Sequence, residues 1–164
     1  MIHKKDKIKN RFSSLHLSLI FMTIIPMLIM GVIVSLFVFN RFTSIMYDEV
    51  EEELKNTALI VSNTYEYAYP GDYSAIGETQ VAVIKGEKVL NGNYDIIDKV
   101  GEETNSEITL YYENVRILTT IVDRNNERIV GSTARKLVVN QVIKGEKSKF
   151  YYNALINNKK YFSY

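Results

Sequence analysis

The chain has 164 residues and a formal net charge of +1 at pH 7, with 20 basic and 19 acidic residues. It contains no cysteine, which excludes disulfides, thiolate chemistry and cysteine-ligated metals. Its only histidines, His3 and His16, lie near the start, so the region downstream of them cannot build a Ser-His-Asp triad or a histidine zinc site. Paired carboxylates remain as a possible catalytic set, but the acidic residues are scattered over expected helix and turn segments, where solvated faces are the ordinary explanation, so we expect no enzyme activity, no metal and no cofactor.

The first feature along the chain is an uncharged apolar run from Leu17 to Phe39 that follows a lysine-rich start. A helix of that length crosses a hydrocarbon core of about 30 Å. By the positive-inside rule the basic flank (Lys4, Lys5, Lys7, Lys9 and Arg11) places the N-terminus in the cytoplasm. We predict a cytoplasmic tail at residues 1–14 and a membrane helix at 15–40. A cleaved signal peptide is the alternative, but its apolar core would be shorter.

The charges divide at the end of this run. Residues 1–41 hold six basic residues and one acidic residue, whereas residues 42–164 hold 14 basic and 18 acidic residues. An acidic outer region argues against nucleic acid as a partner, because binding a duplex needs a clustered positive surface. Its length suits one domain with a real core, outside the cell membrane.

The segment 41–69 has the pattern of a long extracytoplasmic helix. Thr43 or Ser44 is the expected N-cap, and Pro70 with Gly71 ends the helix near Tyr69. Apolar or small residues recur at helical spacing along one stripe: Met46, Val50, Leu54, Thr57, Val61 and Tyr65. This stripe packs either against its own domain or against the same helix of a second subunit.

Beyond Gly71 the pattern changes to short alternating runs. Two strands are expected at Val81–Lys85 and Lys88–Leu90 with Gly86 as their turn, and then a short helix that Gly101 terminates. Two further strands flank Glu113 and Asn114. A helical segment over TARKLVVNQVIKGEKS precedes a final strand pair that turns at Asn157 and Asn158. This order predicts an α+β domain with one antiparallel sheet.

Residues from Tyr73 to Tyr164 resemble the single Cache sensor domain of bacterial methyl-accepting chemotaxis proteins. The resemblance rests on the order of Arg116, Thr119 and Thr120, an Asn-rich turn, Arg128-Ile-Val-Gly131 and a segment ending in Lys144-Gly145. It implies a PAS-like fold over residues 70–164, with a central antiparallel sheet, a small-ligand pocket and a long N-terminal helix joined to the membrane helix. It also implies extracytoplasmic sensing by a homodimer that signals through its membrane helices.

The chain ends inside the last expected strand, with no second membrane span or output region in view. We therefore expect the N-terminal fragment of a longer receptor, whose missing C-terminal region would meet the cytoplasmic signalling proteins. The same sensor also precedes histidine kinases and diguanylate cyclases. A membrane-tethered structural or protein-interaction domain is the alternative of another class.

Arg116 is the most informative candidate for holding a small ligand, because a guanidinium within a strand can grip a carboxylate with two hydrogen bonds. Its alternative role is an edge arginine in water or paired with Glu113. Strand alternation places Leu118 and Thr120 on the face of Arg116, and places Thr119 on the other face. Aromatic residues that could close the pocket, or else belong to the core, are Tyr111, Tyr112, Tyr151 and Tyr152. Gly131 and Ser132 are expected to form a turn into the following helix, where free backbone amides could instead meet an anion.

Overall fold

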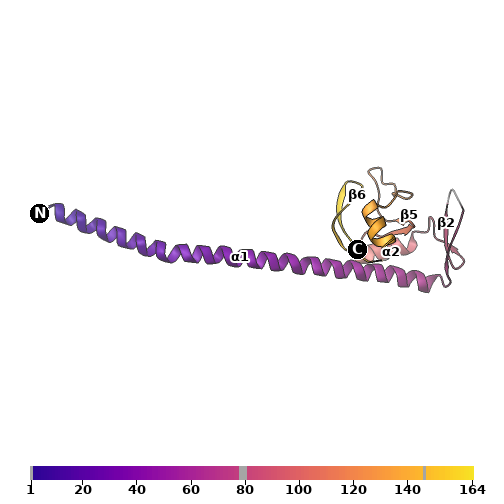
Figure 1. Ribbon diagram of the computed structural model, residues 1–164, viewed down its shortest axis with the longest axis horizontal. Coiled ribbons are helices and arrows are strands. Elements are labelled where there is room, and N and C mark those ends of the chain that lie inside the picture. Colours follow the sequence, from indigo (N-terminus) through magenta and orange to yellow (C-terminus); the bar gives the residue numbers. More distant parts are fainter. Residues whose placement is uncertain (1, 78–80, 146) are drawn as a thin grey trace. The chain divides into compact units, whose positions relative to one another are not determined.

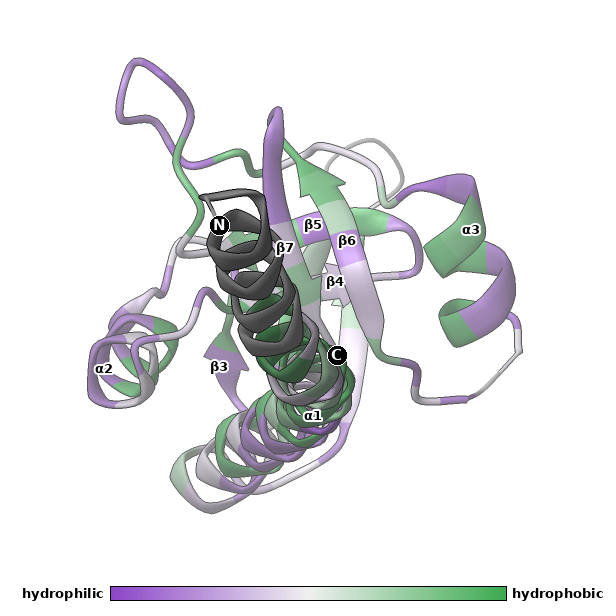
Figure 2. Ribbon diagram, turned by 90° about the vertical axis from the view of Figure 1, so that its left-hand side faces the viewer, coloured by the Kyte–Doolittle hydropathy of each residue, from purple (hydrophilic) through white to green (hydrophobic). Residues whose placement is uncertain are grey.

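The computed structural model describes residues 2–77, 81–145 and 147–164, with side chains described from Leu17 onward. The predicted basic flank and part of the segment before the first hairpin therefore lie outside the described side chains. The chain divides into two compact units at Asp48 and Glu49. The elements, most of which Figures 1 and 2 label, are in chain order α1 (Ile2–Ala68), β1 (Tyr73–Ile76), β2 (Ala82–Lys85), β3 (Lys88–Val89), α2 (Asp95–Thr104), β4 (Thr109–Tyr112), β5 (Val115–Thr119), α3 (Lys136–Val138), a π-helix (Val139–Ile143), β6 (Tyr151–Ile156) and β7 (Lys159–Ser163).

One continuous helix, α1, joins the apolar run to the segment that follows it, with Pro26 inside it. By length and composition, α1 is the one helix in the described part of the chain that could cross a membrane. The expected N-cap at Thr43 or Ser44 is wrong, because both residues lie within α1, where the Thr43 hydroxyl donates to the Phe39 carbonyl at 2.9 Å. The helix ends at Ala68, next to the predicted limit at Tyr69.

The second unit is an α+β domain, as expected. Its strands form three small antiparallel sheets, ordered β1-β2-β3, β4-β5 and β6-β7, instead of the single hydrogen-bonded sheet that we predicted. In Figure 2, α2 and α3 lie on either side of the region that holds β4 to β7. Both predicted hairpin turns are confirmed, with Gly86 at φ 59° and with Asn157 and Asn158 at φ 46° and 62°. Two left-handed residues in succession match the twist of a tight hairpin.

Two local predictions differ from the structure, and one strand has no counterpart among the predictions. Gly101 lies inside α2, and the left-handed Asn105 (φ 49°) ends this helix by donating to the Gly101 carbonyl. The helix predicted after Thr133 is only three residues of α-helix followed by a π-helix, and Leu137 is exposed. Strand β1 was not predicted, because all four of its residues are exposed and show no alternation.

The core of the domain consists of side chains from α1, from α2 and from the regions of the β1-β2-β3 and β4-β5 sheets. Val61 and Tyr65 of α1 pack with Leu90, Ile97 and Leu118, of which the last three are fully buried. Thr57 is buried on the same stripe, whereas Met46 is exposed. The part of the predicted stripe from Thr57 to Tyr65 therefore packs against its own domain.

The end of α1 and the residues that follow it contact the β2–β3 hairpin through both side-chain and backbone groups. The Lys85 side chain is 2% exposed, and its Nζ donates to Glu66 Oε2 at 2.8 Å and to the Gly71 carbonyl at 2.5 Å. The Gly86 amide donates to the Asp72 carbonyl at 3.1 Å. This joint leaves no room for a side chain at Gly86, where a Cβ would lie 2.2 Å from the Pro70 oxygen.

Tyr65 supplies a first test of this packing. Its hydroxyl is buried without a hydrogen-bond partner in the described residues. Burial raises the pKa of Tyr65, and nearby tyrosines and carboxylates raise it further. We expect Tyr65→Phe to increase the free energy of unfolding by about 1 kcal/mol, because an unpaired buried hydroxyl is costly.

The same variant tests the pH dependence. Above about pH 10 the unfolded Tyr65 phenol loses its proton while the folded one keeps it, so the wild-type free energy of unfolding falls as pH rises. The phenylalanine variant lacks this loss, and its advantage in chemical denaturation should grow above that pH. A variant less stable than wild type at neutral pH would show that the Tyr65 hydroxyl is hydrogen-bonded in solution.

Candidate ligand-binding site

The β4–β5 hairpin positions the predicted site residues. Glu113 adopts a left-handed conformation (φ 50°) in its turn, and Tyr111 pairs directly with Arg116. The register shifts between Leu110 and Tyr111, so that β5 carries one more residue than β4 over that step. Such a bulge interrupts strict alternation of faces. All four residues from Arg116 to Thr119 are buried, whereas a strand with one exposed face would alternate between buried and exposed residues.

The Arg116 side chain is 5% exposed and is held by two neutral hydroxyl groups. Its Nη2 donates to Tyr111 Oη at 2.5 Å, and its Nη1 makes a short contact with Ser132 Oγ. The Tyr111 ring lies 5.1 Å from Arg116 Cζ, which adds a cation–π contact. Arg116 is thus neither an edge arginine in water nor a partner of Glu113.

Ser132 reaches Arg116 from a loop that is fixed by backbone bonds. The Arg116 amide donates to the Ser132 carbonyl at 3.0 Å, and the Gly131 amide donates to the Arg116 carbonyl at 2.8 Å. The Ser132 hydroxyl donates to the Ile129 carbonyl at 2.6 Å, which leaves its oxygen as an acceptor toward the guanidinium. The sequence predicted a turn at Ser132, with backbone amides that could meet an anion, and did not predict the contact of its side chain with Arg116. The pairing itself joins residues that are 16 positions apart.

Two observations distinguish Arg116 from an ordinary structural arginine. Within the described residues no carboxylate forms an ion pair with it. Its Nε is buried and has no hydrogen-bond partner there. Burying a cation with an unpaired donor costs folding free energy. An anion that binds there would remove this cost, so the arrangement favours anion binding.

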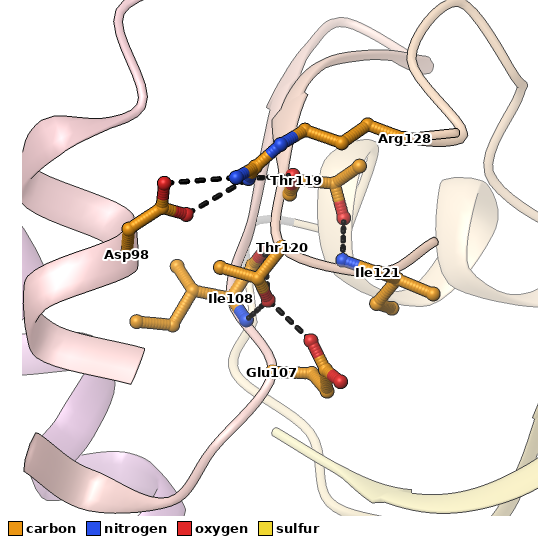
Figure 3. Close-up of polar contacts among 7 residues, drawn as sticks. All are labelled: Asp98, Glu107, Ile108, Thr119, Thr120, Ile121 and Arg128. Carbon is orange, nitrogen blue, oxygen red and sulfur yellow. Dashed lines mark hydrogen bonds and ion pairs between the residues drawn. The ribbon is translucent and has the colours of Figure 1, made fainter. Parts of the chain in front are cut away.

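Arg128 provides the contrast (Figure 3). It binds both oxygens of Asp98 at 2.8 Å and donates to the Thr119 carbonyl at 2.8 Å, while its Cζ lies 4.1 Å from the Tyr94 ring centroid. This guanidinium is already neutralised. Its geometry fits a structural link between α2, the end of β5 and the loop that carries Arg128.

The other predicted site residues do not gather around Arg116. Leu118 is fully buried in the core cluster, and Tyr112 packs against that cluster. The Thr120 hydroxyl contacts Glu107 and the Ile108 amide beside Arg128 (Figure 3), and there it lines a hollow of about 360 Å³. Tyr151 donates to Gln141 at 3.1 Å. The structure therefore brings Tyr111 to Arg116 and places Thr120 and Tyr151 in other contacts.

Residues 88–164, which include β3 to β7 and both arginines, match the family model of single Cache domain 3. This part of the chain is a single Cache domain. Searches of curated proteins and of solved structures found no match for the chain.

The Cache domain carries a coarse functional conclusion. Domains of this kind are non-catalytic sensors that bind small molecules, and with the apolar helix α1 they indicate a membrane protein with an extracellular sensor domain. Arg116 and Ser132 lie inside the matched Cache residues, whereas α1, β1 and β2 precede them.

Proposed function

We propose that this chain is the extracytoplasmic ligand-sensing region of a transmembrane signalling receptor and that its ligand is a small carboxylate. The observation that carries the proposal is the buried guanidinium of Arg116, which has no ion-pair partner among the described residues of the Cache domain and an unused Nε. A carboxylate accepts two parallel hydrogen bonds from such a group and supplies the missing charge.

Tyr111 and Ser132 complete this site in the proposal. Both hydroxyls accept from Arg116; the Tyr111 hydroxyl can donate its own proton to an incoming carboxylate, whereas the Ser132 hydroxyl already donates to the Ile129 carbonyl and holds the guanidinium in place. Leu118 is fully buried in the core cluster and Tyr112 packs against that cluster, so neither is part of the binding that we propose. Thr120 and Tyr151 are engaged elsewhere, so they have no part in the binding that we propose.

The route from this site to the membrane runs through α1. Leu118, two residues after Arg116, belongs to the same buried cluster as Val61 and Tyr65 of α1. A ligand that repacks β5 would therefore bear on the helix that continues from the apolar run. In a homodimer, a small shift of α1 against its partner is the expected signal.

The output class stays a separate proposal. The resemblance favours a chemotaxis receptor, with a histidine kinase or a diguanylate cyclase as the alternatives. Sequencing the locus decides among them: long heptad-patterned helices and a second apolar span in the same reading frame support a chemotaxis receptor, and kinase or cyclase motifs reassign the output.

The ligand class is tested on the full chain in detergent micelles, by thermal unfolding with a panel of short carboxylates, amines and sugars. We expect at least one carboxylate to raise the unfolding temperature saturably, as a ligand that binds only the folded state must. Stabilisation by sugars alone would retain a sensor but contradict the carboxylate. No stabilisation by any compound, together with co-purification of a protein partner, would favour the membrane-tethered interaction domain.

A further inference from the structure

The last part of the domain has a charge opposite to that of the rest. Residues 133–164 hold seven basic residues and one acidic residue, whereas residues 42–132 hold seven basic and 17 acidic residues. A division of charge this strong is typical of proteins that meet a nucleic acid or a membrane surface. We call residues 133–164 the basic region. Its cations are Arg135, Lys136, Lys144, Lys147, Lys149, Lys159 and Lys160.

The positive charge of the basic region is not neutralised by the described residues. All seven cations are exposed, and none forms an ion pair within the described part of the chain. The fold joins the segments that carry them: Tyr151 of β6 donates to Gln141 of the π-helix at 3.1 Å, and β6 pairs with β7. The cations therefore belong to one connected part of the domain.

The basic region also exposes apolar side chains. No residue of α3 or of the π-helix is buried, and Leu137 is 54% exposed. On the β6–β7 hairpin, the rings of Tyr152 and Phe162 are 54% and 40% exposed, and each contacts the buried ring of Phe150. Leucine and aromatic side chains beside lysine and arginine are typical of segments that lie at a membrane interface.

The apolar helix favours a membrane over any other anionic partner. Because α1 runs without a break from the apolar run into the domain, it holds the domain next to the bilayer, where even weak attraction is effective. Within the unit that begins at Glu49, β6 lies toward the start of its part of α1, and β2 lies beyond the end of that helix (Figure 1). We propose that the basic region docks on the headgroups of anionic lipids in the membrane that anchors α1.

Docking of this kind would fix which side of the domain faces the membrane. Residues 42–132 have the opposite charge and are repelled by the same lipids, so only the basic region can face them. Each lysine or arginine that reaches the headgroups strengthens attachment about fivefold. Because this attraction acts over a Debye length of about 10 Å, high salt should release the domain.

The proposal is tested on the full chain in lipid nanodiscs that contain an acceptor dye on the lipid headgroups. Since the chain has no cysteine, one introduced cysteine carries the donor dye. We expect energy transfer from a label at Asn140→Cys, in the exposed π-helix, to be larger in discs with phosphatidylglycerol than in discs of phosphatidylcholine alone. High sodium chloride should remove the difference. Ser74→Cys, in the exposed strand β1, is the matched control and should transfer equally in both discs.

Single lysine variants of the labelled chain test the charges themselves. Lys136→Gln and Lys144→Gln should each lower the ratio of docked to undocked chain about fivefold in the anionic discs. Lys99→Gln removes an exposed lysine of α2 outside the basic region and should dock like the unmodified chain. Arg116→Met should also dock normally, which separates docking from carboxylate binding.

Three outcomes would overturn the proposal. Equal energy transfer from the π-helix in neutral and anionic discs would exclude docking on lipid and leave an acidic protein as the partner of the basic region. An equal increase from the label at Ser74→Cys would mean that the lipids attract the whole domain without orienting it. The proposal rests on the membrane anchor of the proposed function, so a chain that does not enter the discs would contradict both.

Discussion

Arg116→Met is expected to abolish stabilisation by the carboxylate ligand while leaving the ligand-free protein as stable as wild type or more stable. Binding should weaken by roughly 30- to 1,000-fold, because truncating a buried charged partner costs about 2–4 kcal/mol of affinity. Stability should not fall, because methionine fills a similar volume and removes a buried cation that has no ion-pair partner among the described residues. Thermal unfolding with and without the carboxylate measures both effects.

Arg128→Met is the matched control for this prediction. Its guanidinium is paired with both oxygens of Asp98 and is only partly buried, so its loss should cost about 1–2 kcal/mol of stability. Carboxylate binding should survive. If Arg116→Met lowered stability as Arg128→Met does and left ligand affinity unchanged, Arg116 would be a structural residue and would be removed from the site.

Gly86→Ala is expected to destabilise the domain by about 3 kcal/mol, or roughly 10 °C in the unfolding temperature. A Cβ at this position would lie 2.2 Å from the Pro70 oxygen and 3.2 Å from the Pro70 carbonyl carbon. The backbone φ of 59° adds a further cost for any side chain. The segment that follows α1 and the β2–β3 turn are connected by hydrogen bonds, so neither can move away from the added Cβ without disrupting those bonds. The backbone of both segments must therefore shift.

Gly92→Ala separates the clash from the backbone conformation. Gly92 also has a positive φ, of 78°, but no atom lies within 4 Å of the Cβ that would be added. Its replacement should cost only about 1 kcal/mol, the penalty of a left-handed alanine. Chemical denaturation of both variants gives the comparison. Equal destabilisation would mean that the contact between Gly86 and Pro70 relaxes at no cost.

Local chemistry along the chain determined a large part of this protein. The apolar run predicted α1, the glycine and asparagine turns predicted the β2–β3 and β6–β7 hairpins, and the helical stripe predicted that Thr57, Val61 and Tyr65 are buried. Each of these features depends on residues within a few turns of one another, so a pattern reveals them. The Cache resemblance followed from the order of such segments, and the family match confirms it for residues 88–164.

Tertiary structure decided how these segments meet. Strand β1 exists only because β2 pairs with it, and the bulge at Leu110 and Tyr111 overrode the alternation that had placed Thr120 with Arg116. The pairing of Arg116 with Ser132 joins a strand to a loop, and the ion pair of Arg128 with Asp98 joins another loop to α2. Each such contact depends on how the whole core packs. The sequence by itself therefore determined which residue types were available for binding, and only packing decided which of them were left without a partner.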